Sequence, residues 1–124
     1  MFVFKQEYFR HDLVQMYNNY KMFTMGEETI QVPAMGYVEG ISCGAVYFGA
    51  DDPMYSGVGV IAGKHYVGYK GLKDLKKKIQ YYQTHPKQLE KIQKAGYEYI
   101  TKNFTKKKVA DNLIKSMKAE VKTK

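Results

Sequence analysis

Glu39 is the residue whose type and position point most directly to chemistry. It opens residues 39–44 (EGISCG), five positions before a glycine that ends a predicted helix. A carboxylate has two oxygens that accept two hydrogen bonds at once, so it suits a vicinal diol. A negative charge near the C-terminal end of a helix opposes the helix dipole, which favours a functional reason for this residue. The alternative is an ordinary exposed glutamate on a helix surface.

A second polar stretch consists of Gly26, Glu27, Glu28 and Thr29, between a predicted strand and the next predicted helix. Open α/β sheets bind ligands at the carboxyl ends of their strands. Free backbone N–H groups and the positive end of a helix at such a junction suit a diphosphate or sugar hydroxyls. The alternative is an acidic surface loop, because adjacent Glu27 and Glu28 would repel a phosphate that both faced.

The histidines and the glycine-rich loop contain no complete catalytic or metal motif. His11 is interpreted as part of a helix start, His85 as the end of a helix, and His65 as a candidate for the wall of a cleft. The Gly63-Lys64 pair lacks the flanking glycine and hydroxyl residues of a Walker A motif. We therefore predict no metal site and assign no catalytic residue.

Strand-like and helix-like segments alternate along the first part of the chain. Four short apolar runs are predicted strands: residues 1–4, 21–26, 45–48 and 66–69. Helices are predicted at residues 10–20 and 33–44, with Pro33 at a first helical position and Gly44 as the cap. Residues 49–64 are expected to form a long surface loop. The alternation predicts an α/β fold, a partial Rossmann-like, three-layer domain with a small parallel sheet of three or four strands.

From residue 72 onward the pattern is helical only. Two predicted helices meet at the His85-Pro86 pair, and a third begins at Thr105, a suitable N-cap. The third helix is expected to bury three apolar side chains: Val109, Leu113 and Met117. These helices are expected to pack against one side and the edge of the sheet. We assign residues 1–118 to one domain and expect a loose tail at 119–124.

Four segments together resemble the donor-binding domain of GT-B fold glycosyltransferases, in particular the compact "glycosyl transferases group 1" type. They are residues 39–44 (EGISCG), 45–49 (AVYFG), 62–69 (AGKHYVGY) and 74–86, which start with DL and end with YYQTHP. The likeness covers about residues 1–115, and no single segment carries it alone.

The resemblance implies that the chain is the donor-binding part of an enzyme that transfers a sugar from a nucleotide sugar. Glu39 would accept hydrogen bonds from the ribose hydroxyls, and Gly26, Glu27, Glu28 and Thr29 would approach the rest of the donor. The donor is a substrate, and no cofactor or metal is implied. Two positions depart from the family pattern: Val32 replaces a second glutamate, and Gly36 replaces an arginine that is common in the compact group.

The resemblance also implies an N-terminal acceptor-binding domain, which we do not expect within these 124 residues; they are either a piece of a larger enzyme or a small protein that kept only the fold. It further implies upstream basic residues that neutralise the leaving diphosphate. Electrostatic stabilisation of the leaving group is usually the largest catalytic contribution. We therefore expect the isolated chain to transfer no sugar, and to hydrolyse no nucleotide sugar, at a measurable rate.

The composition is that of an ordinary globular domain, with 44% hydrophobic and 26% charged residues. A single cysteine, Cys43, excludes an internal disulfide framework. The N-terminal segment lacks the features of a signal peptide, and no apolar run approaches the length of a membrane span. We expect a soluble, cytoplasmic protein.

Positive charge is concentrated in the C-terminal half. Residues 1–70 hold five Lys and Arg against seven Asp and Glu, whereas residues 71–124 hold fifteen against five. The alternative function is therefore a basic interaction module that binds nucleic acid or an anionic membrane through its lysine-rich helices. If the chain is part of a glycosyltransferase, we expect that it can contact an anionic membrane peripherally. We do not expect it to bind nucleic acid. Ordinary solvated helix faces give the same charge pattern.

Overall fold

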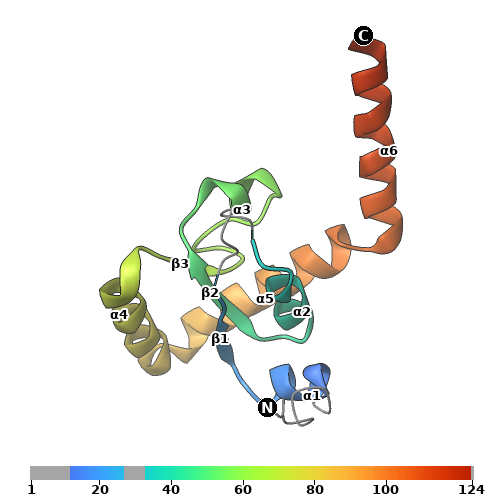
Figure 1. Ribbon diagram of the computed structural model, residues 1–124. Helices are drawn as coiled ribbons and strands as arrows, with labels where there is room; N and C mark the ends of the chain where they lie inside the picture. Colours follow the sequence, from blue (N-terminus) through green and yellow to red (C-terminus); the bar gives the residue numbers. More distant parts are fainter. Residues whose placement is uncertain (1–11, 27–32, 124) are drawn as a thin grey trace, which may run out of the picture.

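The structure, a computed structural model, describes residues 12–26 and 33–123. Helices and strands alternate along this part of the chain (Figure 1). In chain order they are α1 (Leu13–Asn18), β1 (Met22–Thr24), α2 (Gly36–Ser42), β2 (Val46–Ala50), α3 (Pro53–Gly57), β3 (Val67–Tyr69), α4 (Gly71–Thr84), α5 (Pro86–Asn103) and α6 (Lys106–Thr123). The predicted α/β class is confirmed. The first predicted strand, residues 1–4, lies outside the described residues.

The three strands form one parallel sheet in the order β1-β2-β3. Met22 is opposite Val46 in the first pair of strands, and Phe48 is opposite Val67 in the second. Parallel strands need a crossover between them, and here α2 connects β1 to β2 while the segment containing α3 connects β2 to β3. All three strands therefore end at the same edge of the sheet.

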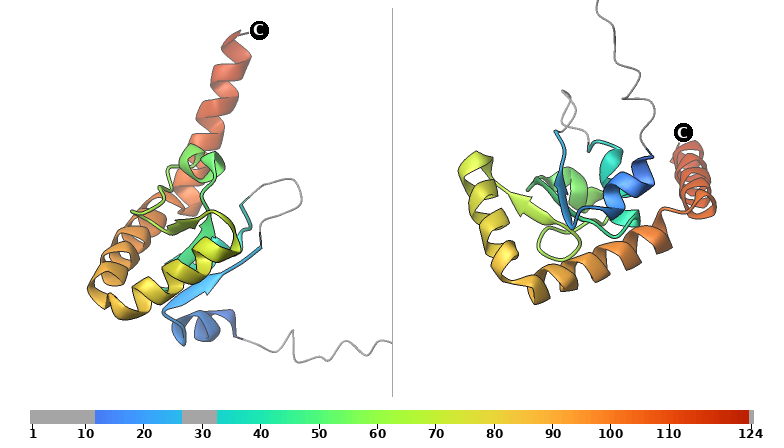
Figure 2. Two further views of the ribbon diagram at one scale, coloured as in Figure 1. Left: turned by 90° about the vertical axis from the view of Figure 1, so that its left-hand side faces the viewer. Right: turned by 90° about the horizontal axis from the view of Figure 1, so that it is seen from below.

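The central strand β2 is buried on both faces, as its continuous apolar sequence predicts. Tyr47 packs in a cluster with side chains of α2, α3 and the end of α5. Its neighbours Val46 and Phe48 point to the opposite cluster, which contains side chains of α4 and the first half of α5. The right-hand view of Figure 2 shows α4 and α5 meeting at an angle around the sheet. This arrangement gives the three layers that the sequence predicts.

Tyrosines fill most of the first cluster. Tyr47 and Tyr55 are almost fully buried, and their hydroxyl oxygens are 2.9 Å apart in a hydrogen bond. Tyr66 stacks against Tyr47, with ring centroids 5.9 Å apart, and donates a hydrogen bond to the carbonyl of Ala50. A tyrosine can be buried at little cost when its hydroxyl forms a hydrogen bond, as these hydroxyls do. Tyr47, Tyr55 and Tyr66 therefore act as core residues.

Two glycines let α2 lie directly against β1. A side chain at Gly36 would collide with the thioether of Met25, and one at Gly40 would collide with the ring of Phe23. The helix begins at Gly36, three residues after Pro33, so the predicted start was wrong. The predicted end is confirmed, because Gly44 follows the helix with a φ of 84°, a conformation that favours glycine.

The segment between β2 and β3 is more ordered than the predicted surface loop. Asp52 caps α3 by accepting a hydrogen bond of 2.8 Å from the Met54 N–H, and Pro53 occupies the first turn. His65 is only 5% exposed, so it belongs to the core and does not line a cleft. Its Nδ1 accepts a hydrogen bond of 3.0 Å from the Ile61 N–H, and its ring stacks on Tyr99 of α5.

The last helix, α6, differs from its prediction in two ways. Its N-cap is confirmed, since the Thr105 hydroxyl accepts a hydrogen bond from the Lys108 N–H. However, Val109, Leu113 and Met117 are 50%, 60% and 60% exposed, so their predicted burial was wrong. The helical pattern shows that these residues share a face, but not that anything covers it. The helix also continues to Thr123, where a loose tail from residue 119 was expected.

We predict that Gly96→Ala destabilises the protein. In an exposed helix this change stabilises by about 1 kcal/mol. Here the added Cβ would collide with the backbone carbonyl oxygen of His65. Overpacking of this kind costs about 1–3 kcal/mol, so urea unfolding should give a lower free energy of unfolding. Gly57→Ala is the matched control, because a Cβ there has no neighbour within 4 Å. A stabilised Gly96→Ala protein would contradict the close contact between α5 and the His65 segment.

We also predict that stability falls as the pH is lowered from about 7 to about 5, partly through His65. Burial lowers the pKa of His65, and the nearby Lys64 lowers it further, so it lies below the value of about 6.5 for the unfolded chain. The unfolded state therefore binds the proton first, and stability is lost as the pH falls through the unfolded value. His65→Gln keeps a hydrogen-bond acceptor without a titrating group.

Urea unfolding at several pH values should show a smaller loss of stability for His65→Gln than for the wild type. His85→Gln, at an exposed histidine, is the control and should keep the wild-type dependence. The prediction fails if His65→Gln and the wild type lose the same free energy over this range.

Candidate functional site

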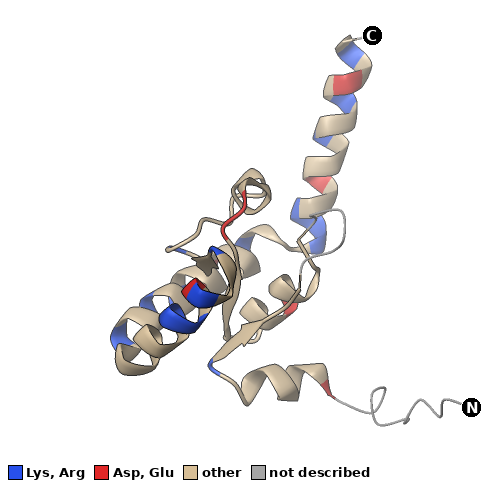
Figure 3. Ribbon diagram, turned by 60° about the vertical axis from the view of Figure 1, so that its left-hand side comes forward, with Lys and Arg blue, Asp and Glu red and all other residues tan. Residues whose placement is uncertain are grey.

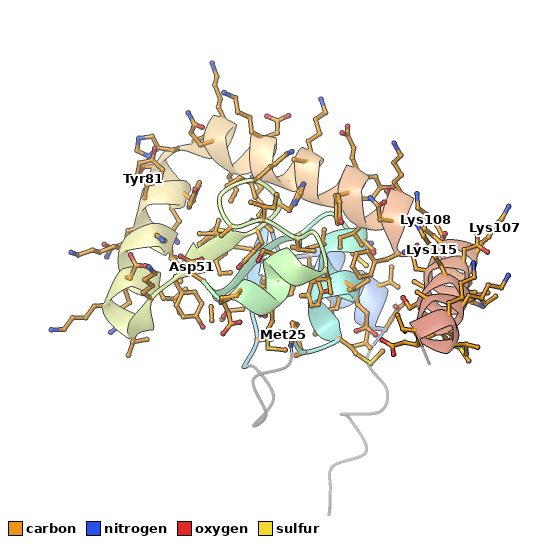
Figure 4. The ribbon with its side chains drawn as sticks, turned by 90° about the horizontal axis from the view of Figure 1, so that it is seen from above. Met25, Asp51, Tyr81, Lys107, Lys108 and Lys115 are labelled. Atoms are coloured by element: carbon orange, nitrogen blue, oxygen red, sulfur yellow. The ribbon has the colours of Figure 1, made fainter. Side chains whose placement is uncertain are left out.

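The carboxyl ends of the three strands bring together residues that are far apart in the sequence. Gly26 follows β1, Asp51 follows β2 and Lys70 follows β3. The Asp51 N–H donates a hydrogen bond of 3.0 Å to the carbonyl of Tyr69, which joins the last two strand ends. Figure 4 labels Met25 and Asp51 near these ends. Ligands of open parallel sheets bind at this edge.

A pocket of about 540 Å³ lies at the ends of β2 and β3. Its walls combine polar and apolar side chains: Asp51, Asp52, Pro53, Ser56, Val60, Ile61, Ala62, Tyr66 and Lys70. The Lys70 Nζ is 3.8 Å from an Asp51 carboxylate oxygen, and both side chains are largely exposed. An exposed pair of this kind is weak. A ligand can therefore replace this ion pair at a small cost in free energy.

Tyr66 forms a fixed part of the pocket wall. The side chain is 1% exposed, and its hydroxyl donates a hydrogen bond of 3.0 Å to the Ala50 carbonyl. Burial, followed by the charge of Asp51, raises the pKa of Tyr66 to about 12. The phenol therefore stays protonated at neutral pH and acts as a neutral wall, not as a general base.

The start of α4 holds Lys70 in place. An Asp74 carboxylate oxygen accepts a hydrogen bond of 2.9 Å from the Lys70 N–H. It also lies 3.1 Å from the Lys78 Nζ, which in turn donates to the Gly68 carbonyl of β3. The hydrogen bond from Lys70, and then the one from Lys78, lower the pKa of Asp74. This network fixes the backbone at Lys70 and leaves its side chain exposed at the pocket.

Glu39 lies on α2, outside the lining of this pocket. It is exposed, and within the part of the chain that the structure describes its carboxylate forms no hydrogen bond or ion pair. Tyr17 of α1 is its electrostatic neighbour: burial, then Glu39, then Cys43 raise the pKa of the Tyr17 phenol. Because α2 begins at Gly36 and ends at Ser42, Glu39 is the central residue of this seven-residue helix. Its charge is as close to one end of the helix dipole as to the other, so the dipole gives no argument for a functional role.

Gly26 follows β1, and Glu39 lies on α2, the next helix along the chain. Met25, next to Gly26, contacts Gly36 one helical turn before Glu39. The Tyr17 hydroxyl points to the Met25 sulfur at 3.9 Å. Glu27, Glu28 and Thr29 lie outside the described residues. The structure thus places Glu39 apart from the pocket at Asp51 and Lys70.

The pocket residues Asp51, Asp52, Ser56 and Lys70 are not among the site residues predicted from the sequence. A signal was present, because Asp51 and Asp52 follow a buried strand directly and Lys70 follows the next one. Their proximity depends on the pairing of β2 with β3, where Ala50 is opposite Tyr69. That register was not predicted from the sequence.

Residues 12–26 and 33–123 contain no group of three or more His, Cys, Asp or Glu side chains placed to hold a metal ion. None of the helices in these ranges combines the length and the apolar character needed to cross a membrane.

Comparison with known proteins gives one match. The family described as glycosyl transferase-like matches residues 3–115. No curated protein and no solved structure matches the chain. The matched range covers most of the chain, including all three strands, α2 and the residues of the pocket. The chain therefore belongs to the glycosyl transferase-like family.

Proposed function

We propose that this chain is the donor-binding part of a GT-B type glycosyltransferase that uses a nucleotide sugar. The family supports glycosyl transfer in general. The observation that supports the finer proposal is the pocket at the ends of β2 and β3, together with Gly26 after β1 and Glu39 on the helix that packs against β1. A nucleotide sugar has a diol-bearing nucleoside at one end and a hydroxyl-rich sugar at the other, which suits two separated polar regions.

Glu39 is proposed to bind the ribose. Its carboxylate is exposed and forms no hydrogen bond or ion pair with other described residues, so both oxygens can accept bonds from the two ribose hydroxyls. The neighbouring Tyr17 ring and the close packing of α2 on β1 fix the helix that carries it. The segment from Gly26 to Thr29 is proposed to approach the diphosphate through its backbone N–H groups.

The pocket at Asp51 and Lys70 is proposed to hold the sugar. Two carboxylates and one ammonium group give its walls a net negative charge. This charge disfavours a diphosphate and suits neutral hydroxyls, which donate hydrogen bonds to carboxylates. Ser56 adds a hydroxyl, and Val60 and Ala62 supply apolar surface for the face of a sugar ring.

The chain alone is proposed to bind the donor without transferring the sugar. Departure of a nucleoside diphosphate needs positive groups at the phosphates. In the described ranges, Lys70 is the only cation that lines the pocket, and it pairs with Asp51. Other basic groups, such as those of an acceptor-binding domain, would have to complete the site.

We predict that Glu39→Ala weakens the binding of a nucleoside diphosphate by about tenfold or more. The reason is the loss of hydrogen bonds to a charged acceptor, which typically costs about 1.5–3 kcal/mol. Calorimetric titration with UDP, GDP and ADP measures the change. Glu90→Ala removes an exposed glutamate from α5 and is the matched control. Equal affinities of the wild type and Glu39→Ala would remove Glu39 from the site.

We further predict that Asp51→Asn weakens the binding of the sugar end of the donor and not that of its nucleotide end. The variant should bind a nucleotide sugar several-fold more weakly, because an amide is a poorer acceptor than a carboxylate for sugar hydroxyls. Its affinity for the matching nucleoside diphosphate should be unchanged. Asp111→Asn, on α6, is the control with the same change of charge. Equal losses for both ligands would show that the pocket does not hold the sugar.

A further inference from the structure

The apolar side of α6 is uncovered along its whole length. Figures 1 and 2 show the helix standing away from the sheet and from the other helices. No side chain of α6 is buried. The exposed fractions of its large apolar side chains run from 50% to 76%: Val109, Leu113, Ile114, Met117 and Val121. Residues of this kind are normally covered when they line one face of a helix.

These five side chains form one continuous stripe. At 100° per residue they fall within an arc of roughly 140° around the helix axis. Glu120 lies at one margin of this arc, and Lys106 enters it at the first residue of the helix. The rest of the stripe has no charge. It is as wide as the apolar face of an ordinary surface helix, but the described chain places nothing on it.

Lysines occupy the arc next to the stripe. Five of them fall within roughly 100° on one flank: Lys107, Lys108, Lys115, Lys118 and Lys122. Figure 4 shows Lys107, Lys108 and Lys115 extending from one side of α6, and Figure 3 shows blue segments along the helix. Asp111 is the one carboxylate on this flank. Over the helix as a whole, six lysines against two carboxylates leave a net charge of +4.

We propose that α6 is an interfacial helix that docks on an anionic lipid surface. A helix that lies in the plane of a membrane buries an apolar face among the acyl chains and sets lysines at the headgroup level. Adjacent apolar and lysine arcs meet both requirements in one orientation of the helix. The positive charge selects anionic lipids, which attract basic residues close to the surface. This inference is independent of the donor site, which uses other elements.

The positive charge of α6 disfavours a second copy of the chain as the partner that covers the apolar stripe. Pairing of two α6 helices along their stripes would bring two charges of +4 together, which is unfavourable. An antiparallel symmetric pair would also set the two lysine flanks side by side. An anionic lipid surface supplies opposite charge along the whole flank.

The test is flotation of the 124-residue protein with vesicles of phosphatidylcholine, with and without phosphatidylserine. We expect binding to the anionic vesicles only, and weaker binding as salt is added. The double variant Leu113→Glu/Met117→Glu should lower the bound fraction at least about tenfold, because it places charge in the apolar arc. Asn112→Glu/Thr123→Glu adds the same charge on the polar side of α6 and is the matched control.

A second pair of variants separates α6 from general positive charge. Lys115→Gln/Lys118→Gln should weaken vesicle binding and its salt dependence more than Lys73→Gln/Lys76→Gln, which removes two lysines from α4. Because the mutated α6 side chains are exposed, unfolding of the variants is not expected, and circular dichroism checks this.

Three results would overturn the proposal. One is absence of binding to anionic vesicles. Another is binding that Leu113→Glu/Met117→Glu does not reduce relative to its control. The third is a dimer, detected by light scattering without lipid, that Leu113→Glu/Met117→Glu converts to a monomer. Nucleoside diphosphate titration of the same variants keeps this test separate from the donor site, because α6 takes no part in that site.

Discussion

The central strand β2 has to bury side chains on both of its faces, and the rest of the fold follows from this requirement. Tyr47 on one face needs α2 and α3, while Val46 and Phe48 on the other need α4 and α5. α5 contributes to both clusters, with Ile100 in the first and Ile92 in the second. A helix that touches both clusters holds the layers in one arrangement, so the ends of the strands have defined positions.

The polar edge of the sheet depends on this packing. The close approach of α2 to β1 at Gly36 and Gly40 fixes the helix that carries Glu39. Pairing of β2 with β3 sets Asp51 beside Lys70, and the capping of α3 by Asp52 shapes the pocket between them. Glu39, Asp51 and Lys70 are exposed and lie outside both core clusters, which leaves them available to a ligand.

Local signals in the sequence predicted the elements better than they predicted the contacts between them. The buried strand β2 and the cap at Gly44 were predictable because apolar runs and glycine act locally. The short helix α3, capped by Asp52, was not predicted because the composition of residues 49–64 is typical of a loop. The start of α2 was placed at Pro33, whereas the helix begins at Gly36, so Glu39 lies at its centre instead of near its C-terminal end. The pocket depends on the register between β2 and β3, and the exposure of α6 depends on which other elements pack against it. A local sequence pattern predicts neither of these.

The donor site can be tested directly by following the amide chemical shifts of the isotope-labelled protein during titration with a nucleotide sugar. We expect perturbations in two groups: Gly26 with the residues of α2 around Glu39, and the residues around Asp51 and Lys70 at the ends of β2 and β3. The matching nucleoside diphosphate should perturb the first group alone. Perturbations confined to the lysine-rich helices α4 to α6, or no perturbation by either ligand, would contradict the assignment of this edge as a donor site.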